Sequence, residues 1–294
     1  MQLVSIPDGD KITCIIANET MGWVLEIAKK MRINVAAFWP ALVDCNTSCE
    51  LEAAAFTLFA QILPGGPLLA SNRLGKSVGY FWPEDSDCLA WLNKQPPQSV
   101  IYVVALGSFT VFDPTQFREL ALGLELTNRP FLWAVRQDLT TETDNAYPEG
   151  FKDRMQGRGR LTGWAPQQQV LSHPSVACFL SRCGWNSTIE GLCNGVPFLC
   201  WPYFADQFLN ESYICDVWMI GLGFERDANG IIPQEEIKDK IEQLLTGGEY
   251  KKRALDLKAK VIDNNKNDGS SGKNFSNLVQ WIKDEKNHSC IEQS

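Results

Sequence analysis

The fold is decided by residues 164–207, WAPQQQVLSHPSVACFLSRCGWNSTIEGLCNGVPFLCWPYFADQ. This stretch predicts a helical turn at 167–171, a strand at ACFLS, a helix at 187–193 and a strand at VPFLCW. Strands that alternate with helices form a parallel sheet whose two faces are both covered by helices. The stretch therefore predicts an α/β fold.

The same alternation continues on both sides of this stretch. SVIYVVALG, from residue 99, predicts a buried strand, and PFLWAVR and GRLTGW predict two more. Asp113 before Pro114 predicts a helix start, because an acid can cap the first N–H groups and proline fits the first helical position. That helix is predicted to end near Leu126. Further helices are predicted at 86–94, 206–217, 234–246, 248–263 and 272–286.

The amino-terminal part has its own alternating pattern. Residues 11–40 predict a strand, a helix and a second strand, with Val24, Ile27 and Met31 on one face of the helix. A segment rich in glycine, proline and serine at 62–85 predicts an interdomain connection. We therefore expect a partial amino-terminal domain at 1–61, a linker at 62–98, a carboxyl-terminal domain at 99–275, and a helix and tail at 276–294.

The composition excludes several classes of protein. Of the 294 residues, 45% are hydrophobic and 21% are charged, and the net charge of -8 disfavours nucleic acid and anionic membrane surfaces as partners. No apolar run approaches the ~20 residues of a membrane span, so we expect no stable membrane insertion. The cysteines form no CxxC pair and there are only 2 histidines, so we expect no zinc site. We interpret the cysteines as reduced thiols of a cytoplasmic protein.

The turn from Gly184 to Ser187 predicts an anion site. Gly184 allows close approach of the backbone, and the free N–H groups of the following helix attract an anion such as a diphosphate. A simpler interpretation is a capping box, in which Ser187 and Glu190 only satisfy backbone N–H groups. The local sequence favours the capping box, and the surrounding stretch favours the anion site.

Other candidate residues follow the predicted strands at their carboxyl ends, where ligands of parallel sheets bind. Trp164 can stack on a base, or it is a core tryptophan. Asp206, followed by Gln207, can bind hydroxyls or cap the next helix, and the two roles are compatible. Ser108, in a glycine turn, can contact phosphate or be an ordinary turn serine.

Two further nucleotide-binding patterns are disfavoured. Asp8-Gly9-Asp10 and Asp85-Ser86-Asp87 have the spacing of acids that hold a divalent metal on a nucleotide diphosphate. Both lie in turn-like segments, so we interpret them as turn and cap acids. No GxGxxG pattern follows a predicted strand, which disfavours a dehydrogenase-type nucleotide binder.

Residues 164–207 resemble the signature stretch of plant family 1 UDP-glycosyltransferases nearly end to end. The similarity extends over 99–275, includes PEGF at 148–151, and is strongest to the 83A group. The resemblance implies a GT-B-like fold, with a complete Rossmann-like carboxyl-terminal domain and a partial amino-terminal one in which the chain begins. It also implies inverting transfer of a sugar, commonly glucose, from a UDP-sugar to a hydroxyl of a small lipophilic acceptor. No metal and no other cofactor is implied.

The resemblance also implies which residues contact the donor. The ribose would bind Glu190, the phosphate Ser108, and the sugar hydroxyls Asp206 and Gln207. Arg182 stands where the family usually has a histidine on the diphosphate, and an arginine could bind the phosphates or crowd them. The full expected set is Ser108, Trp164, Ala165, Gln167, Arg182, Gly184, Trp185, Asn186, Ser187, Glu190, Asp206 and Gln207.

Catalysis is where the chain departs from the family. The family's base is a histidine oriented by an aspartate, and neither His173 nor His288 matches it. Asn18 stands at the aspartate position and lacks the negative charge that stabilises a protonated imidazole. A stretch with acceptor-pocket helices is also missing between FWPALVD and CNTSCELE. Two hypotheses follow: an active UDP-glycosyltransferase, or a UDP-sugar-binding protein without transfer.

Overall fold

The chain forms two compact units, residues 1–68 with 263–294 and residues 69–262. The first boundary lies inside the predicted linker, and the second lies before the predicted end of the carboxyl-terminal domain at 275. The structure is a computed structural model that describes residues 14–18, 22–31, 33–38, 47–48, 51–52, 63–68, 85, 87–104, 113–135, 147–266 and 268–283.

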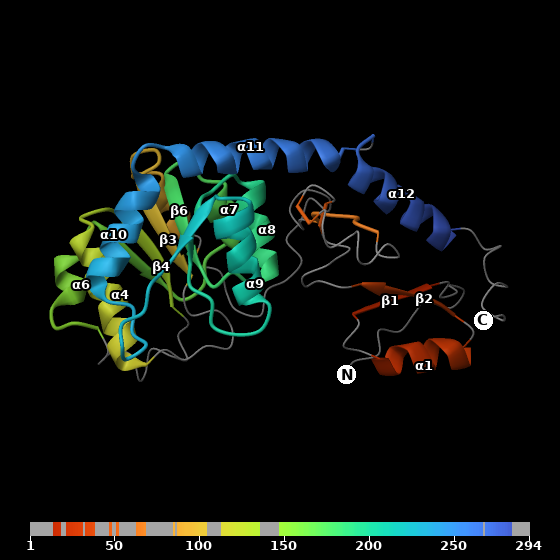
Figure 1. The fold of residues 1–294 in the computed structure, drawn as a ribbon, viewed down its shortest axis with the longest axis horizontal. Coiled ribbons are helices and arrows are strands. Elements are labelled where there is room, and N and C mark those ends of the chain that lie inside the picture. Colours follow the sequence, from red (N-terminus) through yellow and green to blue (C-terminus); the bar gives the residue numbers. More distant parts are fainter. Residues whose placement is uncertain are drawn as a thin grey trace. The chain divides into compact units, whose positions relative to one another are not determined.

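The described part of residues 69–262 contains a 6-stranded parallel sheet with the strand order β5-β4-β3-β6-β7-β8 (Figure 1). This sheet confirms the predicted α/β fold. The short β8 was not predicted, because Gly-Leu-Gly lacks the β-branched and aromatic residues that mark strands. The strands are β3 (Val100–Val104), β4 (Phe131–Ala134), β5 (Gly159–Thr162), β6 (Val176–Ser181), β7 (Phe198–Cys200) and β8 (Gly221–Gly223).

Helices cover both faces of this sheet (Figure 1). On the face of α4 and α10, Phe117 stacks on Trp133 of β4 with 4.8 Å between ring centroids. On the face of α8, a side chain at Gly191 would collide with Phe198 of β7, so glycine lets the helix approach the sheet closely. The helices of residues 69–262 are α3 (Asp87–Leu92), α4 (Pro114–Leu126), α6 (Phe151–Arg154), α7 (Gln167–Leu171), α8 (Trp185–Cys193), α9 (Gln207–Ser212), the π-helix η3 (Tyr213–Val217), α10 (Gln234–Leu245) and α11 (Glu249–Asn264), which ends just beyond this range. The helix α12 (Ser270–Lys283) belongs to the other unit.

The helix bounds follow the sequence signals closely. Asp113 caps α4 by accepting a hydrogen bond from Thr115 N–H at 2.8 Å, Pro114 is the first helical residue, and the helix ends at Leu126 as predicted. The predicted helices at 86–94, 234–246, 248–263 and 272–286 correspond to α3, α10, α11 and α12, and the one at 206–217 divides into α9 and η3. Within the described residues, no helix is both long and apolar enough to cross a membrane.

The unit of residues 1–68 and 263–294 confirms the predicted strand, helix and strand. The predicted apolar face of α1 is wrong, however: Val24 and Ala28 are buried, whereas Ile27 is 42% exposed and Met31 57%. Val24 and Ala28 lie one helical turn apart, so the buried face of α1 is centred on these two smaller side chains. The elements are β1 (Cys14–Asn18), α1 (Gly22–Met31) and β2 (Asn34–Phe38), with β1 and β2 parallel.

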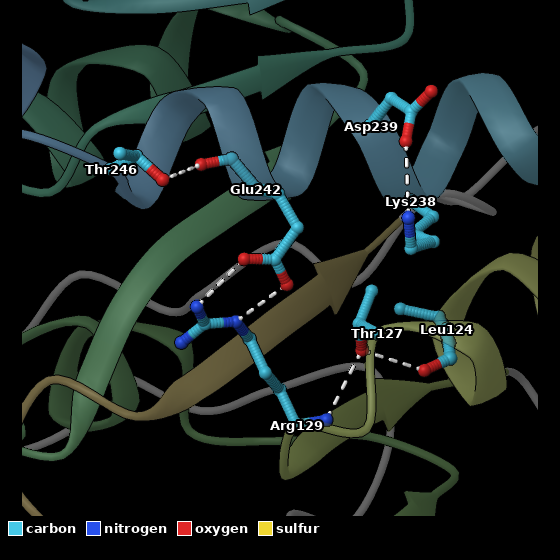
Figure 2. A network of polar contacts seen from close by, with 7 residues as sticks. All are labelled: Leu124, Thr127, Arg129, Lys238, Asp239, Glu242 and Thr246. Carbon is cyan, nitrogen blue, oxygen red and sulfur yellow. Dashed lines mark hydrogen bonds and ion pairs between the residues drawn. The ribbon is translucent and has the colours of Figure 1, made fainter.

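A polar network at the amino ends of the strands ties α10 to the start of β4 (Figure 2). Arg129 donates to both carboxylate oxygens of Glu242, with Nε–Oε1 at 3.0 Å and Nη2–Oε2 at 2.9 Å. The Arg129 hydrogen bond holds the pKa of Glu242 below its usual value. Thr127 donates from Oγ1 to the Leu124 carbonyl at 2.7 Å and so closes the end of α4. These contacts stabilise the edge of the sheet opposite the predicted site.

The cysteines of the described residues are free thiols, as predicted. Burial raises the pKa of Cys178 to about 12 and that of Cys88 to about 11. Such thiols stay protonated at neutral pH and pack as small apolar side chains.

Candidate functional site

The predicted anion site lies where β6 ends and α8 begins. Gly184 is the N-cap of α8, and the first helical bond runs from Thr188 N–H to the Gly184 carbonyl at 2.9 Å. No side chain caps this end of α8. The first N–H groups of a helix have no partner inside the helix, so they are available to an anion. A Cβ on Gly184 would meet no atom within 4 Å, so the turn is open on that side.

The capping-box interpretation of Ser187 and Glu190 is wrong. α8 begins at Trp185, two residues earlier than predicted, so Ser187 lies inside the first turn instead of preceding it. The Ser187 Oγ accepts a hydrogen bond from Gln167 Nε2 at 3.0 Å. The true start was missed because the N-cap is a glycine, which lacks the side-chain oxygen that usually marks this position.

Glu190 is held by two side-chain amides from α7. Gln167 Nε2 donates to Oε2 at 2.6 Å, and Gln168 Nε2 donates to Oε1 at 3.1 Å. The position of the carboxylate is therefore fixed, and each oxygen keeps a lone pair for another donor. Gln168 is not among the predicted residues. The only hint in the sequence was that Gln168 is a second glutamine on the short helix α7, next to Gln167.

Trp164 and Ala165 lie directly after the carboxyl end of β5, as predicted. The Trp164 side chain is partly exposed, and Ala165 is buried. The Trp164 carbonyl accepts a hydrogen bond from Asp85 N–H at 2.8 Å, which fixes the backbone beside the indole. A partly exposed indole at a strand end suits stacking on a base.

Asp85 is a cap acid, as predicted. Its Oδ1 accepts from Asp87 N–H at 2.9 Å at the start of α3, and its Oδ2 accepts from Arg160 Nη2 at 3.0 Å and Thr162 Oγ1 at 2.9 Å. These contacts outweigh desolvation and lower the pKa of Asp85. Both oxygens of the Asp85 carboxylate therefore bind groups of β5 and α3. The other triplet, residues 8–10, lies outside the described residues.

Arg182 directs its guanidinium toward two aromatic rings. The residue is 7% exposed, and its Cζ lies 5.5 Å from the ring centroid of Tyr203 and 5.6 Å from that of Phe204. Both rings belong to the loop after β7, which also carries Asp206. A guanidinium in this position is stabilised by the ring faces and stays charged. The expected contact between Arg182 and a diphosphate stays a prediction.

Within the turn, Trp185 is buried and Asn186 is exposed. The centroid of the Trp185 ring lies 6.4 Å from that of Trp218, so the Trp185 side chain packs inside the domain. Trp185 can therefore contribute only its backbone to the anion site. The Trp185 Nε1 and the Thr188 Oγ1 have no hydrogen-bond partner within the described residues. The Asn186 side chain is therefore the one that solvent reaches most easily.

Asp206 and Gln207 lie in the loop after β7, where α9 begins. Gln207 is buried, and its Oε1 accepts from the N–H groups of Tyr203 at 2.8 Å and Phe204 at 3.2 Å. Asp206 occupies the N-cap position of α9 but makes no side-chain capping bond, so its predicted capping role is wrong. Its Oδ2 instead accepts from Asn210 Nδ2 at 3.0 Å, which pulls the side chain along the helix.

Asn210 joins this loop to the turn before α8. The same Nδ2 also donates to the Cys183 carbonyl at 2.7 Å, and Asn210 is fully buried. Asn210 is not among the predicted residues, although an amide one helical turn after Asp206 was visible in the sequence. The turn after β6 and the loop after β7 therefore share one side chain.

One of the expected donor-binding residues, Ser108, falls outside the described residues, as does His288. Asn18, which the resemblance places at the position of the orienting aspartate, is the last residue of β1 in the other compact unit.

His173 lies at the amino ends of the strands, just before β6 begins, whereas the predicted anion site lies at their carboxyl ends. Its Nδ1 lies 2.8 Å from Ser175 Oγ, and its Nε2 lies 3.1 Å from Asn93 Oδ1. Burial lowers the pKa of His173 and so favours the neutral ring. β6 spans 6 residues, which separates His173 from the turn by roughly 20 Å. His173 therefore does not reach the anion site.

Residues 83–265 match the family described as "UDP-glucoronosyl and UDP-glucosyl transferase", and this match covers more than half of the chain. UDP-glycosyltransferase 83A1 of Arabidopsis thaliana is 38% identical over 360 residues, with coverage of 95% of this chain and 75% of the relative. UDP-glycosyltransferase 76B1 of Arabidopsis thaliana is 36% identical, with coverage of 87% and 57%. The 7-deoxyloganetin glucosyltransferase of Gardenia jasminoides is 39% identical, with coverage of 81% and 50%.

The lengths of these matches agree with an internally shortened chain. The first alignment extends over 360 residues, more than the 294 of the chain, so the relative has residues inside the aligned span that this chain lacks. The chain spans three quarters of that relative's length, and 57% and 50% of the other two.

Solved structures show the same fold. Os79 from O. sativa in complex with UDP has a TM-score of 0.83 at 24% identity, with coverage of 92% of this chain and 78% of that chain. Phytolacca americana UGT2 complexed with UDP-2fluoro-glucose and pterostilbene has a TM-score of 0.71 at 31% identity, with coverage of 88% and 55%. The GT-B-like fold implied by the sequence is thus confirmed, and the chain belongs to the UDP-glycosyltransferase family of plants.

Proposed function

We propose that this chain binds a UDP-sugar at the carboxyl edge of the 6-stranded sheet, as the donor-binding part of a UDP-glycosyltransferase. The observation that carries the proposal is the pair of amides that fixes Glu190 beside the uncapped start of α8. A carboxylate held in this way can accept hydrogen bonds from two ribose hydroxyls, and the helix start next to it can bind a diphosphate.

We assign the other expected residues to the uracil, the diphosphate and the sugar of the donor in turn. Trp164 would stack on the uracil, with Ala165 beside it. The diphosphate would lie at the backbone of Gly184, Trp185 and Asn186, with Ser187 and Ser108 nearby. The helix dipole and a charged Arg182 both favour a negative group there.

The sugar would lie at Asp206 and Gln207. Because the Gln207 oxygen already accepts two backbone N–H groups, its Nε2 is left to donate, whereas the Asp206 carboxylate can only accept. A donor beside an acceptor suits two neighbouring hydroxyls of a hexose, and glucose is the sugar we propose. No metal is needed in this arrangement, since backbone N–H groups and Arg182 would balance the phosphate charge.

In the proposed reaction, the sugar would be transferred to a hydroxyl of a small lipophilic acceptor, with inversion at the anomeric carbon. The exposed rings of Tyr203, Phe204 and Phe208, near the proposed sugar position, offer apolar surface for such an acceptor. Pterostilbene, bound to Phytolacca americana UGT2, is a ligand of this kind. We also propose that the protein acts in the cytoplasm.

A second candidate function is binding of a UDP-sugar without transfer. One observation favours it: His173 is held at the amino ends of the strands, away from the anion site. The resemblance adds that Asn18 stands at the position of the orienting aspartate. A neutral acceptor hydroxyl is a poor nucleophile without a base.

A turnover assay separates the two candidates. The full chain is incubated with UDP-glucose and a panel of phenolic acceptors, with and without EDTA, and the anomeric configuration of any product is read by NMR. Transfer with inversion that EDTA leaves unchanged would support the first candidate. Binding of UDP without product would support the second, and the absence of both would contradict the proposed donor site.

A further inference from the structure

We propose that Asn210 is a positioning residue that couples the diphosphate turn to the sugar-binding carboxylate of Asp206. This inference rests on the proposed function, because it assigns a task to a side chain between two parts of that donor site. The Asn210 Nδ2 uses one hydrogen on the Cys183 carbonyl at 2.7 Å and the other on Asp206 Oδ2 at 3.0 Å. A single amide thus holds both partners.

The contact to Cys183 sets the direction of the turn. Cys183 has a φ of 59°, a left-handed conformation that is unfavourable for a residue with a side chain. Its carbonyl shares a peptide plane with the N–H of Gly184, and in a trans peptide these two groups point in opposite directions. By holding the carbonyl, Asn210 directs the Gly184 N–H away from itself and orients the backbone that leads into α8.

The contact to Asp206 fixes the loop after β7, which carries the proposed sugar-binding residues. Asn210 lies one turn after Asp206 on α9, and its backbone N–H also bonds the Asp206 carbonyl at 2.9 Å. The side-chain amide occupies one lone pair of Oδ2 and so fixes the orientation of the carboxylate, which leaves Oδ1 and the second lone pair of Oδ2 to accept from sugar hydroxyls. The contact to the Cys183 carbonyl is buried and does not compete with bulk water, whereas the contact to Asp206 is partly buried.

Two substitutions at Asn210 test this role. Asn210→Leu removes both donors, and Asn210→Asp keeps the shape of the side chain but turns the donor into an acceptor. The matched controls are Gln116→Met and Gln116→Glu, because Gln116 is also buried and bonds backbone of the same domain, at Ile232, through both ends of its amide. Gln116 lies on α4, on the other face of the sheet.

The first measurement is calorimetric binding of UDP and of UDP-glucose to the full chain. We expect UDP-glucose to bind wild type more tightly than UDP, and both Asn210 variants to lose about tenfold in UDP affinity and most of the preference for UDP-glucose. Asp206→Asn should weaken UDP-glucose binding in wild type and have little further effect in the Asn210→Leu background. Additive effects, or equal losses in the Gln116 variants, would overturn the coupling.

A second measurement does not depend on ligand. Hydrogen exchange should accelerate at residues 182–187 and 203–210 in the Asn210 variants and stay unchanged there in the Gln116 variants. Unchanged exchange in these segments would overturn the positioning role, even if UDP binds. If exchange accelerates as expected but wild type binds no UDP, the proposed function fails and the coupling of the two loops stands.

Discussion

Gln168 on α7 donates a hydrogen bond to Glu190 on α8, with 3.1 Å between Nε2 and Oε1. The neighbouring Gln167 takes the other carboxylate oxygen, so Glu190 is in place before any ligand arrives. A group that is ordered in advance loses less entropy on binding. If Glu190 binds the ribose as proposed, the affinity for ribose depends on α7 as well as on α8.

Replacing Gln168 by leucine should weaken UDP binding about three- to tenfold, because the loss of a hydrogen bond to a charged group leaves Glu190 less ordered. A UDP analogue without the ribose hydroxyls should bind the variant and wild type equally. Gln169→Leu is the control, because Gln169 is exposed on the same helix. Equal weakening for UDP and for the analogue would show that Gln168 does not act through the ribose.

The strands and most helices could be predicted from the sequence because their signals are local. Asp113 and Pro114 fixed the start of α4, and apolar runs marked the strands that the sheet buries. Local signals failed where tertiary contacts decide the structure. Gly184 gives no capping signal, the buried face of α1 includes Ala28 instead of Ile27, and Gly-Leu-Gly forms β8 because β7 lies beside it.

The same distinction holds for the site. The positions of Trp164 and Asp206 after strands could be predicted because parallel strands bring their carboxyl ends together, and their contacts with a ligand stay predictions. Gln168 and Asn210 could not be found in this way, because their roles come from the side chains they meet across two elements. The aromatic neighbours of Arg182 likewise come from a loop about twenty residues later in the chain.

Arg182 and Tyr203 should be energetically coupled. A cation over a half-exposed aromatic ring contributes about 0.5–1 kcal/mol. We expect Arg182→Met and Tyr203→Leu to be non-additive by roughly this amount in the free energy of unfolding, measured with urea. Arg182→His should also change UDP affinity if the guanidinium reaches the diphosphate. Additive unfolding energies would contradict the stacking, and an unchanged affinity would count against the phosphate contact.

Removing the ion pair of Arg129 and Glu242 should affect stability and not ligand binding. Glu242→Gln should lower the free energy of unfolding by about 0.5–1 kcal/mol at pH 7, since the pair is partly exposed but bidentate. The folded pKa of Glu242 is depressed, so its contribution is present above the ordinary value of 4.5 and is lost as pH falls through the folded pKa. A difference between wild type and variant that stays constant down to pH 3 would contradict this assignment.

His173 should make the fold less stable in mild acid. Its folded pKa lies below the ordinary 6.5, so as pH falls below that value the unfolded chain takes up a proton that the folded chain does not. The loss of stability levels off below the folded pKa. Urea unfolding at pH 7.5 and pH 5.5 should show a larger decrease for wild type than for His173→Gln. An equal decrease in the two proteins would show that His173 titrates normally.

Calorimetric titration of UDP into the full chain examines whether the uncapped start of α8 and the fixed Glu190 bind a UDP-sugar. We expect saturable binding at concentrations up to about 1 mM. Glu190→Ala should lose this binding, and Glu235→Ala, which changes an exposed acid on α10, should keep it. No binding to wild type at millimolar UDP, or equal binding by Glu190→Ala, would contradict the account.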